Sequence, residues 1–151
     1  MSRYQDVVID AGGHDSTSLR AALLLSDAVL IPYPPRTMDV WALADMAKLI
    51  EEARSVRDGL LAMGVLNIAD PGVSADNVDA EAALADVPQL SGLQASITRR
   101  KAFPNAAGFG LSVEELTPSD PKACAELSAL VREVSAMVEH YPATGEALHG
   151  H

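Results

Sequence analysis

The sequence has one cysteine, few basic residues and no long apolar run. Cys124 alone cannot form an intramolecular disulfide or a Cys-x-x-Cys metal pair, and this cysteine usage fits a reducing cytoplasm. No apolar stretch approaches the roughly 20 residues of a membrane-spanning helix. The first residues also lack the charged-then-apolar pattern of a secretory signal. We therefore expect a soluble, cytoplasmic protein with no membrane partner.

Charge narrows the range of binding partners. The chain has 11 basic and 21 acidic residues, a formal net charge of -10 and an isoelectric point near 4.6. This surplus disfavours broad, nonspecific attraction to nucleic acid or anionic membranes. Contact with DNA would need a local basic patch, and residues 99–101 form the only basic cluster. A run of three charges is most often a solvated loop, so both interpretations of this cluster stay open.

Hydrophobic patterning indicates one domain of the α/β class. At 151 residues and 48% hydrophobic, the chain can bury one ordinary core. Short apolar runs alternate with segments of helical periodicity. The runs predict strands at 7–10, 28–31, 65–68 and 93–97, and the periodic segments predict helices at 17–26, 37–57, 76–86 and from 121 onward. Their alternation predicts a mostly parallel sheet with helices on both faces. We expect a domain at 1–140 and a flexible tail at 141–151.

Two local expectations qualify this pattern. Pro32 lacks the backbone donor that a central strand needs, so the second strand is predicted to end before it. The stretch 103–110 contains several glycine, proline and asparagine residues and is predicted to be loop-rich, with about one helical turn.

Asp10 stands at the end of the first predicted strand and is followed by Gly12 and Gly13. In parallel α/β sheets, ligands bind outside the carboxyl ends of the strands. A carboxylate there, with a glycine loop beside it, suits a Mg²⁺-bound water and an approaching phosphate. The alternative is that Asp10 caps the loop and the glycines satisfy turn geometry. Residue types alone do not decide between these two interpretations.

Other polar residues follow the remaining predicted strands and should face the same crevice. Asn67 and Asp70 form an Asn-x-x-Asp pair, whose amide can read a purine edge because it offers both a donor and an acceptor. Asp39 falls in the first turn of the long helix, where the helix dipole favours a carboxylate. Arg99 follows the fourth predicted strand and could bind phosphate or DNA.

Several segments, in this order, resemble the second half of a ParA/MinD-type partition ATPase of the deviant Walker class. They are Val7-Val8-Ile9-Asp10, Ser26-Asp27-Ala28-Val29-Leu30-Ile31-Pro32, Val65-Leu66-Asn67-Ile68-Ala69-Asp70-Pro71, Ile97-Thr98-Arg99-Arg100 and Gly110-Leu111-Ser112-Val113. Each segment alone is unspecific, but the combination is specific and covers nearly the full chain.

The resemblance implies roles for the matching residues. Asp10 falls at the Walker B-type position that supports the Mg²⁺ water, and residues 11–13 fall where the family senses the γ-phosphate. Asn67 and Asp70 fall where related proteins touch adenine. Asp39 matches a rim position near the dimer face.

The resemblance assigns the loop that follows the fourth strand as well. Arg99 and Pro104 lie in a loop that, in the family, closes over the base and contributes to the dimer or DNA surface. The implied cofactors are ATP and Mg²⁺. The implied partners are a second copy in a homodimer, DNA bound nonspecifically and a ParB-like protein that triggers hydrolysis. The implied role is plasmid or chromosome segregation.

The sequence departs from the family at one motif. It contains no Gly-x-x-x-x-Gly-Lys-[Ser/Thr] phosphate loop. We expect the phosphate loop and its strand to come before residue 1, so this chain alone is not expected to hydrolyse ATP. The strand at 7–9 would then lose a neighbour and leave an apolar edge, which self-association or a separate N-terminal partner would cover. The alternatives are a non-catalytic interaction module with the same fold, or another P-loop relative such as a cobyrinate-synthase-like or chromosome-partition maturation factor.

Overall fold

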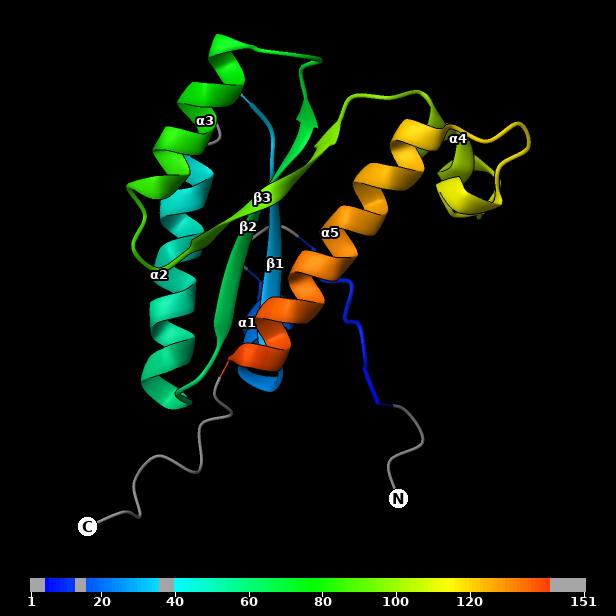
Figure 1. Ribbon diagram of the computed structural model, residues 1–151. Coiled ribbons are helices and arrows are strands. Elements are labelled where there is room, and N and C mark those ends of the chain that lie inside the picture. The colour runs from blue at the N-terminus through cyan, green and yellow to red at the C-terminus, as the bar shows by residue number, and fades with distance from the viewer. Residues whose placement is uncertain (1–4, 13–15, 36–39, 142–151) are drawn as a thin grey trace.

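A computed structural model describes residues 5–12, 16–35 and 40–141 (Figure 1). Helices and strands alternate along most of the chain. The helices are α1 (Thr17–Leu25), α2 (Val40–Val56), α3 (Ala75–Ala85), α4 (Ala102–Gly108) and α5 (Pro121–His140), with the short 3-10 helix η2 at Val113–Glu115. The strands are β1 (Ala28–Tyr33), β2 (Leu61–Ala69) and β3 (Ser91–Thr98).

The three strands form one parallel sheet in the order β1-β2-β3. Helices α2 and α3 lie on one side of the sheet and α5 lies on the other (Figure 1). The predicted α/β fold with a parallel sheet between helices is therefore confirmed. No helix in the described ranges is both long enough and apolar enough to cross a lipid bilayer.

Burial distinguishes the central strand from the edge strand. All of residues 61–66 in β2 are buried, as expected of a strand with helices on both faces. In β1, Ile31 and Tyr33 are buried and face the core formed with α1, α2 and α3. Leu30, which points to the other face, is 40% exposed. The sheet is therefore covered on both sides at β2 and on one side at β1.

Local sequence explains where two of the helices begin. The Ser16 hydroxyl accepts a hydrogen bond from the Leu19 backbone N–H at 3.1 Å and caps α1. Asp120 caps α5 by accepting from the Lys122 and Ala123 backbone N–H groups at 3.0 and 3.1 Å. Pro121 occupies the first position of that helix, where a missing N–H has no cost.

Helix α5 supplies hydrogen-bond acceptors to β3. The register between β2 and β3 shifts twice, so β3 has backbone donors that β2 does not use. The Glu133 carboxylate accepts the Gln94 and Ala95 N–H groups, each at 2.7 Å. The Glu126 carboxylate accepts the Thr98 N–H at 3.1 Å. These two glutamates therefore satisfy backbone donors of β3 that have no acceptor in β2.

The predicted strand at Val7–Asp10 is wrong for this structure. Residues 6–10 form no strand, and Val7 and Val8 are 79% and 93% exposed. Their β-branched side chains favour extended backbone, but a strand also needs a neighbour to pair with. Within the described residues this segment has none, and the open edge of the sheet belongs to β1 instead.

The predicted end of the second strand before Pro32 is also wrong. Strand β1 continues through Pro32 to Tyr33. The Asp27 carbonyl accepts the Leu61 N–H at 3.0 Å, so residues 27, 29, 31 and 33 direct their backbone groups toward β2. The nitrogen of Pro32 therefore faces outward, where a missing donor is tolerated on an edge strand. Helix α4 is likewise longer than the single turn predicted for this region.

Candidate functional site

Strands β2 and β3 bring two groups of predicted site residues together. Asn67 is the register partner of Ile97, and Ala69 is that of Thr98. The Arg99 N–H then donates to the Ala69 carbonyl at 2.9 Å. The residues that follow the two strands, from Asn67 and from Arg99 onward, therefore lie beside each other at the carboxyl edge of the sheet, where parallel α/β folds bind ligands.

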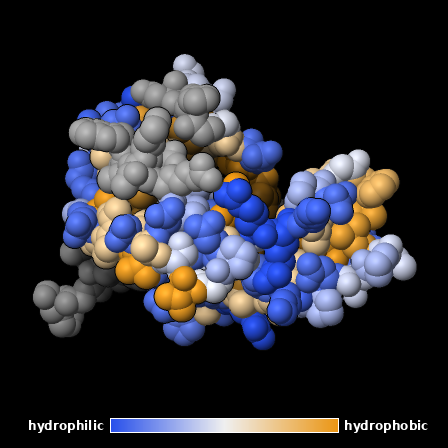
Figure 2. Space-filling model, turned by 90° about the horizontal axis from the view of Figure 1, so that it is seen from above, coloured by the Kyte–Doolittle hydropathy of each residue, from blue (hydrophilic) through white to orange (hydrophobic). Residues whose placement is uncertain are grey.

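This edge is visible from above in Figure 2. Hydrophilic side chains gather between the main body of the molecule and the lobe on the right that contains α4. The basic residues Arg99 and Lys101 are exposed in the connection between β3 and α4. Phe109, 78% exposed, contributes an apolar surface at the end of that lobe. The edge thus combines polar groups with a neighbouring apolar surface.

Asn67 has a side-chain amide that is available to a ligand. It is half-buried, and none of the described residues forms a hydrogen bond with that amide. The next residue, Ile68, has a φ of 55° and is the extra residue where the register with β3 shifts. A β-branched residue rarely adopts this left-handed conformation. Bulges of this kind re-aim neighbouring side chains and are common beside functional sites.

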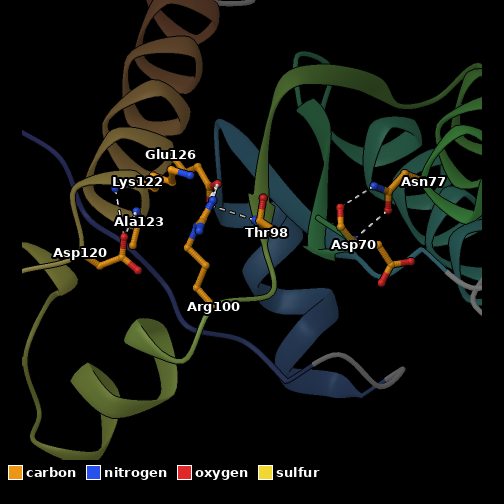
Figure 3. Close-up of polar contacts among 8 residues, drawn as sticks. All are labelled: Asp70, Asn77, Thr98, Arg100, Asp120, Lys122, Ala123 and Glu126. Carbon is orange, nitrogen blue, oxygen red and sulfur yellow. Dashed lines mark hydrogen bonds and ion pairs between the residues drawn. The ribbon is translucent and has the colours of Figure 1, made fainter. Parts of the chain in front are cut away.

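Asp70, by contrast, holds the connection into α3 (Figure 3). Its carboxylate accepts the Ser74 hydroxyl at 3.1 Å, and its backbone N–H donates to Asn77 Oδ1 at 3.0 Å. Asn77 Nδ2 in turn donates to the Asp70 carbonyl at 2.9 Å. Of the predicted Asn-x-x-Asp pair, Asn67 is therefore free to bind and Asp70 is already engaged. Asn77 was not among the predicted site residues; it lies half-buried in the first turn of α3, and no motif in the sequence marks it.

Of the two arginines after β3, Arg100 is likewise engaged by a partner and Arg99 is not. Arg100 Nε and Nη2 both donate to Glu126 Oε1, at 3.1 and 2.7 Å (Figure 3). Burial raises the pKa of the Glu126 carboxyl, but hydrogen bonds from Arg100 and Thr98 outweigh it and leave that pKa below its usual value. The same hydrogen bond raises the pKa of Arg100. The charge of Arg100 is thus neutralised by α5, whereas Arg99 has no ion-pair partner among the described residues.

Asp10 lies in the segment that forms no regular structure. It is exposed, and its side chain has no hydrogen bond with any described residue. Ala11 beside it packs against the main core. Residues 5–12 contain two carboxylates, Asp6 and Asp10. Mg²⁺ is commonly held by one or two carboxylates, waters and substrate phosphates. The exposed Asp10 carboxylate is the type of group that such a site uses.

The structure around Gly12 tests the alternative interpretation, in which Gly12 and Gly13 are needed only for a tight turn. A β-carbon at Gly12 would meet no atom within 4 Å, and Gly12 does not have the positive φ found at Gly59, Gly72 and Gly110. The described fold therefore imposes no need for glycine at this position. Gly13 and the predicted site residue Asp39 lie outside the described residues.

Two further observations complete the site. Pro104 lies exposed in α4, beyond the basic connection. Among residues 5–12, 16–35 and 40–141, no group of three or more His, Cys, Asp or Glu side chains could hold a metal ion by itself.

Comparison with known proteins supplies a relative. No family model matches the chain. Over 130 residues, the chain is 29% identical to "Maintenance of carboxysome distribution protein A" of Halothiobacillus neapolitanus, and this match covers 85% of the chain. The chain spans 59% of the length of that relative. This similarity, together with the parallel α/β fold, supports a ParA-like relationship for the chain.

Proposed function

We propose that this chain is part of a ParA-like ATPase that positions a cellular cargo. The observation that carries the proposal is the unpartnered Asn67 amide beside Arg99 at the carboxyl edge of a parallel sheet. The similarity to a carboxysome distribution protein adds support for a positioning role. Positioning includes segregation of plasmid or chromosome DNA as well as distribution of a compartment.

Each residue has a task in this proposal. The Asn67 amide offers a donor and an acceptor to the edge of adenine. Arg99 supplies a positive charge at the rim, and the lobe that contains Pro104 closes over the base. Asp10 orients a Mg²⁺-bound water, and Gly12 leaves room for the phosphates. ATP and Mg²⁺ would bind when a phosphate loop, which this sequence lacks, is supplied by other polypeptide.

The proposed partners follow the family resemblance. A homodimer would form around the nucleotide, and DNA would contact the exposed Arg99 and Lys101. A ParB-like protein would trigger hydrolysis. Because Arg99 and Lys101 would contact phosphates, DNA binding should weaken as salt concentration rises.

The test is calorimetric titration of Mg-ATP into this chain in complex with a phosphate-loop segment. We expect Asn67→Ala to weaken ATP binding about ten-fold and to reduce the preference for ATP over GTP, because the base loses its hydrogen bonds. Asn77→Ala is the contrast, since it should lower the melting temperature without changing base preference. Equal ATP affinity and equal base preference in Asn67→Ala would refute the assignment of Asn67.

Two further variants test the rest of the site. Arg99→Gln should weaken binding, whereas Arg132→Gln, an exposed arginine on α5, should leave it unchanged. Asp10→Ala should slow hydrolysis more than it weakens binding, because its role is to orient the metal-bound water. Normal turnover in Asp10→Ala would contradict that role.

A non-catalytic interaction module is the second candidate function. The open backbone edge of β1 favours it, because an unpaired strand can bind another chain whether or not a nucleotide is present. The same calorimetry separates the two candidates. Failure of the complex to bind Mg-ATP would favour the interaction module.

A further inference from the structure

One carboxylate on α5 holds the chain on both sides of Arg99. Glu126 Oε2 accepts the Thr98 backbone N–H at 3.1 Å, and Glu126 Oε1 accepts Nε and Nη2 of Arg100 at 3.1 and 2.7 Å (Figure 3). Between these contacts, the Arg99 N–H donates to the Ala69 carbonyl of β2 at 2.9 Å. Three consecutive residues at the end of β3 are therefore fixed from two directions, by a helix and by a strand.

Of these three residues, Arg99 is the one whose charged group stays open to a ligand. Arg99 is exposed, and no described residue forms a hydrogen bond or ion pair with its guanidinium. The side chains of Arg100 and Glu126 are 24% and 20% exposed, whereas every side chain in the other ion pairs of the described residues is at least 42% exposed. Solvent and salt therefore screen the pair beside Arg99 least.

The charge of Arg100 makes a carboxylate acceptable at this place. A lone carboxylate at the carboxyl edge of the sheet would repel an anionic ligand. Arg100 Nη2 lies 2.7 Å from Glu126 Oε1 and balances its charge. Glu126 can then anchor the backbone without adding net negative charge next to Arg99.

A second glutamate of α5 makes the same kind of contact away from the site. The Glu133 carboxylate, about two turns further along the helix, accepts the Gln94 and Ala95 N–H groups, each at 2.7 Å. It holds the middle of β3 and no residue beside Arg99. Both glutamates attach α5 to β3, but only the two oxygens of Glu126 bracket the free arginine.

We propose that Glu126 is a positioning residue, which holds Thr98 and Arg100 and thereby fixes the place of the Arg99 guanidinium at the ligand site. This inference rests on the proposed function. An arginine on an ordered backbone loses less conformational entropy when it binds a phosphate than one on a mobile loop. Helix α5 thus contributes to the binding of an anionic ligand that it does not touch.

The direction of an affinity change separates positioning from simple electrostatics. The assay is titration of Mg-ATP into the chain in complex with a phosphate-loop segment. Glu126→Gln removes a negative charge near the site, so electrostatics alone would strengthen binding. Positioning predicts the reverse, a weakening of about three-fold or more, because the amide has one acceptor oxygen and turns an NH₂ group toward the other donor.

Glu133→Gln is the matched control. It removes the same charge from the same helix and the same type of contact with β3, but it leaves the residues beside Arg99 in place. It should therefore not weaken Mg-ATP binding, although both variants should be less stable than the parent. Circular dichroism checks that both variants fold. Equal weakening by the two substitutions would overturn the proposal, since it would assign the effect to the attachment of α5 as a whole.

A double-mutant cycle tests whether Glu126 acts through Arg99. In the Arg99→Gln background, Glu126→Gln should change the affinity for Mg-ATP by less than about 1.5-fold, because the side chain that Glu126 positions is gone. The same weakening in both backgrounds would overturn the proposal.

Nuclear spin relaxation gives a test that needs no ligand. In the ¹⁵N-labelled chain alone, the Arg99 backbone amide should have an order parameter near the rigid value of about 0.85. This value should fall by more than about 0.1 in Glu126→Gln and stay unchanged in Glu133→Gln. The Gln94 amide should show the opposite pattern. An unchanged order parameter at Arg99 in Glu126→Gln would overturn the proposal.

The two proposals fail separately. Mg-ATP binding that is weakened by Arg99→Gln but not by Glu126→Gln refutes the positioning role alone. A parent complex that does not bind Mg-ATP refutes the nucleotide function. The relaxation measurement then decides the role of Glu126: loss of order at Arg99 in Glu126→Gln supports it, and unchanged order refutes it.

Discussion

Gly64 offers a sharp test of how α3 packs on the sheet. A β-carbon at this position would lie 2.8 Å from both Cδ1 and Cδ2 of Leu84, closer than real β-carbon contacts. Leu84 is 2% exposed and belongs to the main core, so its methyl groups have little space to move. Gly64→Ala should therefore push α3 away from β2 or force Leu84 from its rotamer.

The expected magnitude follows from two opposing terms. Overpacking a core costs about 1–3 kcal/mol. Replacing glycine with alanine stabilises by about 0.4–1 kcal/mol, because it restricts the unfolded chain. Gly64→Ala should then lower the free energy of unfolding by up to roughly 2.6 kcal/mol. For a chain of this size, each kcal/mol lowers the melting temperature by about 2–4 °C.

Urea unfolding monitored by circular dichroism measures this change. Gly92→Ala should cost less, since its β-carbon would be 3.1 Å from Leu84 Cδ2, and Gly12→Ala should cost nothing, because nothing lies within 4 Å. In a Leu84→Ala background the clash is absent, so Gly64→Ala should become neutral or stabilising by up to about 1 kcal/mol. An equal cost of Gly64→Ala in both backgrounds would refute the packing argument.

Three further predictions concern stability. Burial, and to a smaller extent the charge of Glu81, raises the pKa of Tyr33 to about 12, so its stabilising contribution is complete below about pH 10 and is lost as pH rises through 12. The free energy of unfolding, measured from pH 9 to 12, should fall less steeply in Tyr33→Phe than in the parent, by roughly 2 kcal/mol over this range, and an identical fall would contradict the assignment. Because the pKa of Glu126 is lowered, its contribution is present above the ordinary glutamate range and is lost as pH falls through and below about 4. Glu126→Gln should therefore be less stable than the parent at pH 7, and the difference should shrink by pH 3, whereas a difference independent of pH would argue against the ion pair. Ile50 is fully buried, so Ile50→Ala should cost about 2–5 kcal/mol, while the same change at exposed Leu25 should cost less than about 1 kcal/mol in the same denaturation assay.

Local patterns were sufficient to predict most of the fold. The apolar runs now seen in β1, β2 and β3 and the helical spacing in α2 and α5 follow from short-range periodicity. The cap at Ser16 and the start at Pro121 are likewise set by residues within one turn of each helix. The alternation of strands and helices then predicts the α/β class, because parallel strands require crossover connections.

The sequence also predicted that the residues after the strands now seen as β2 and β3 would lie at one edge of the sheet, but not which of them would be free. Asn67 and Asp70 have the same signal in the sequence, as do Arg99 and Arg100. Their difference depends on partners distant in the sequence: Asn77 holds the Asp70 backbone, and Glu126, on α5, neutralises Arg100. Periodicity carries no information about such partners.

By itself, the sequence determined the α/β class, the three strands β1, β2 and β3 and the helices between them, because these follow from local propensity and hydrophobic spacing. Tertiary structure alone decided that Val7–Asp10 is no strand, that β1 continues through Pro32 and that β1 is the open edge. The physical reason is that a strand is stabilised by its neighbours. Pairing decides whether an apolar run joins the sheet and which direction its backbone donors face.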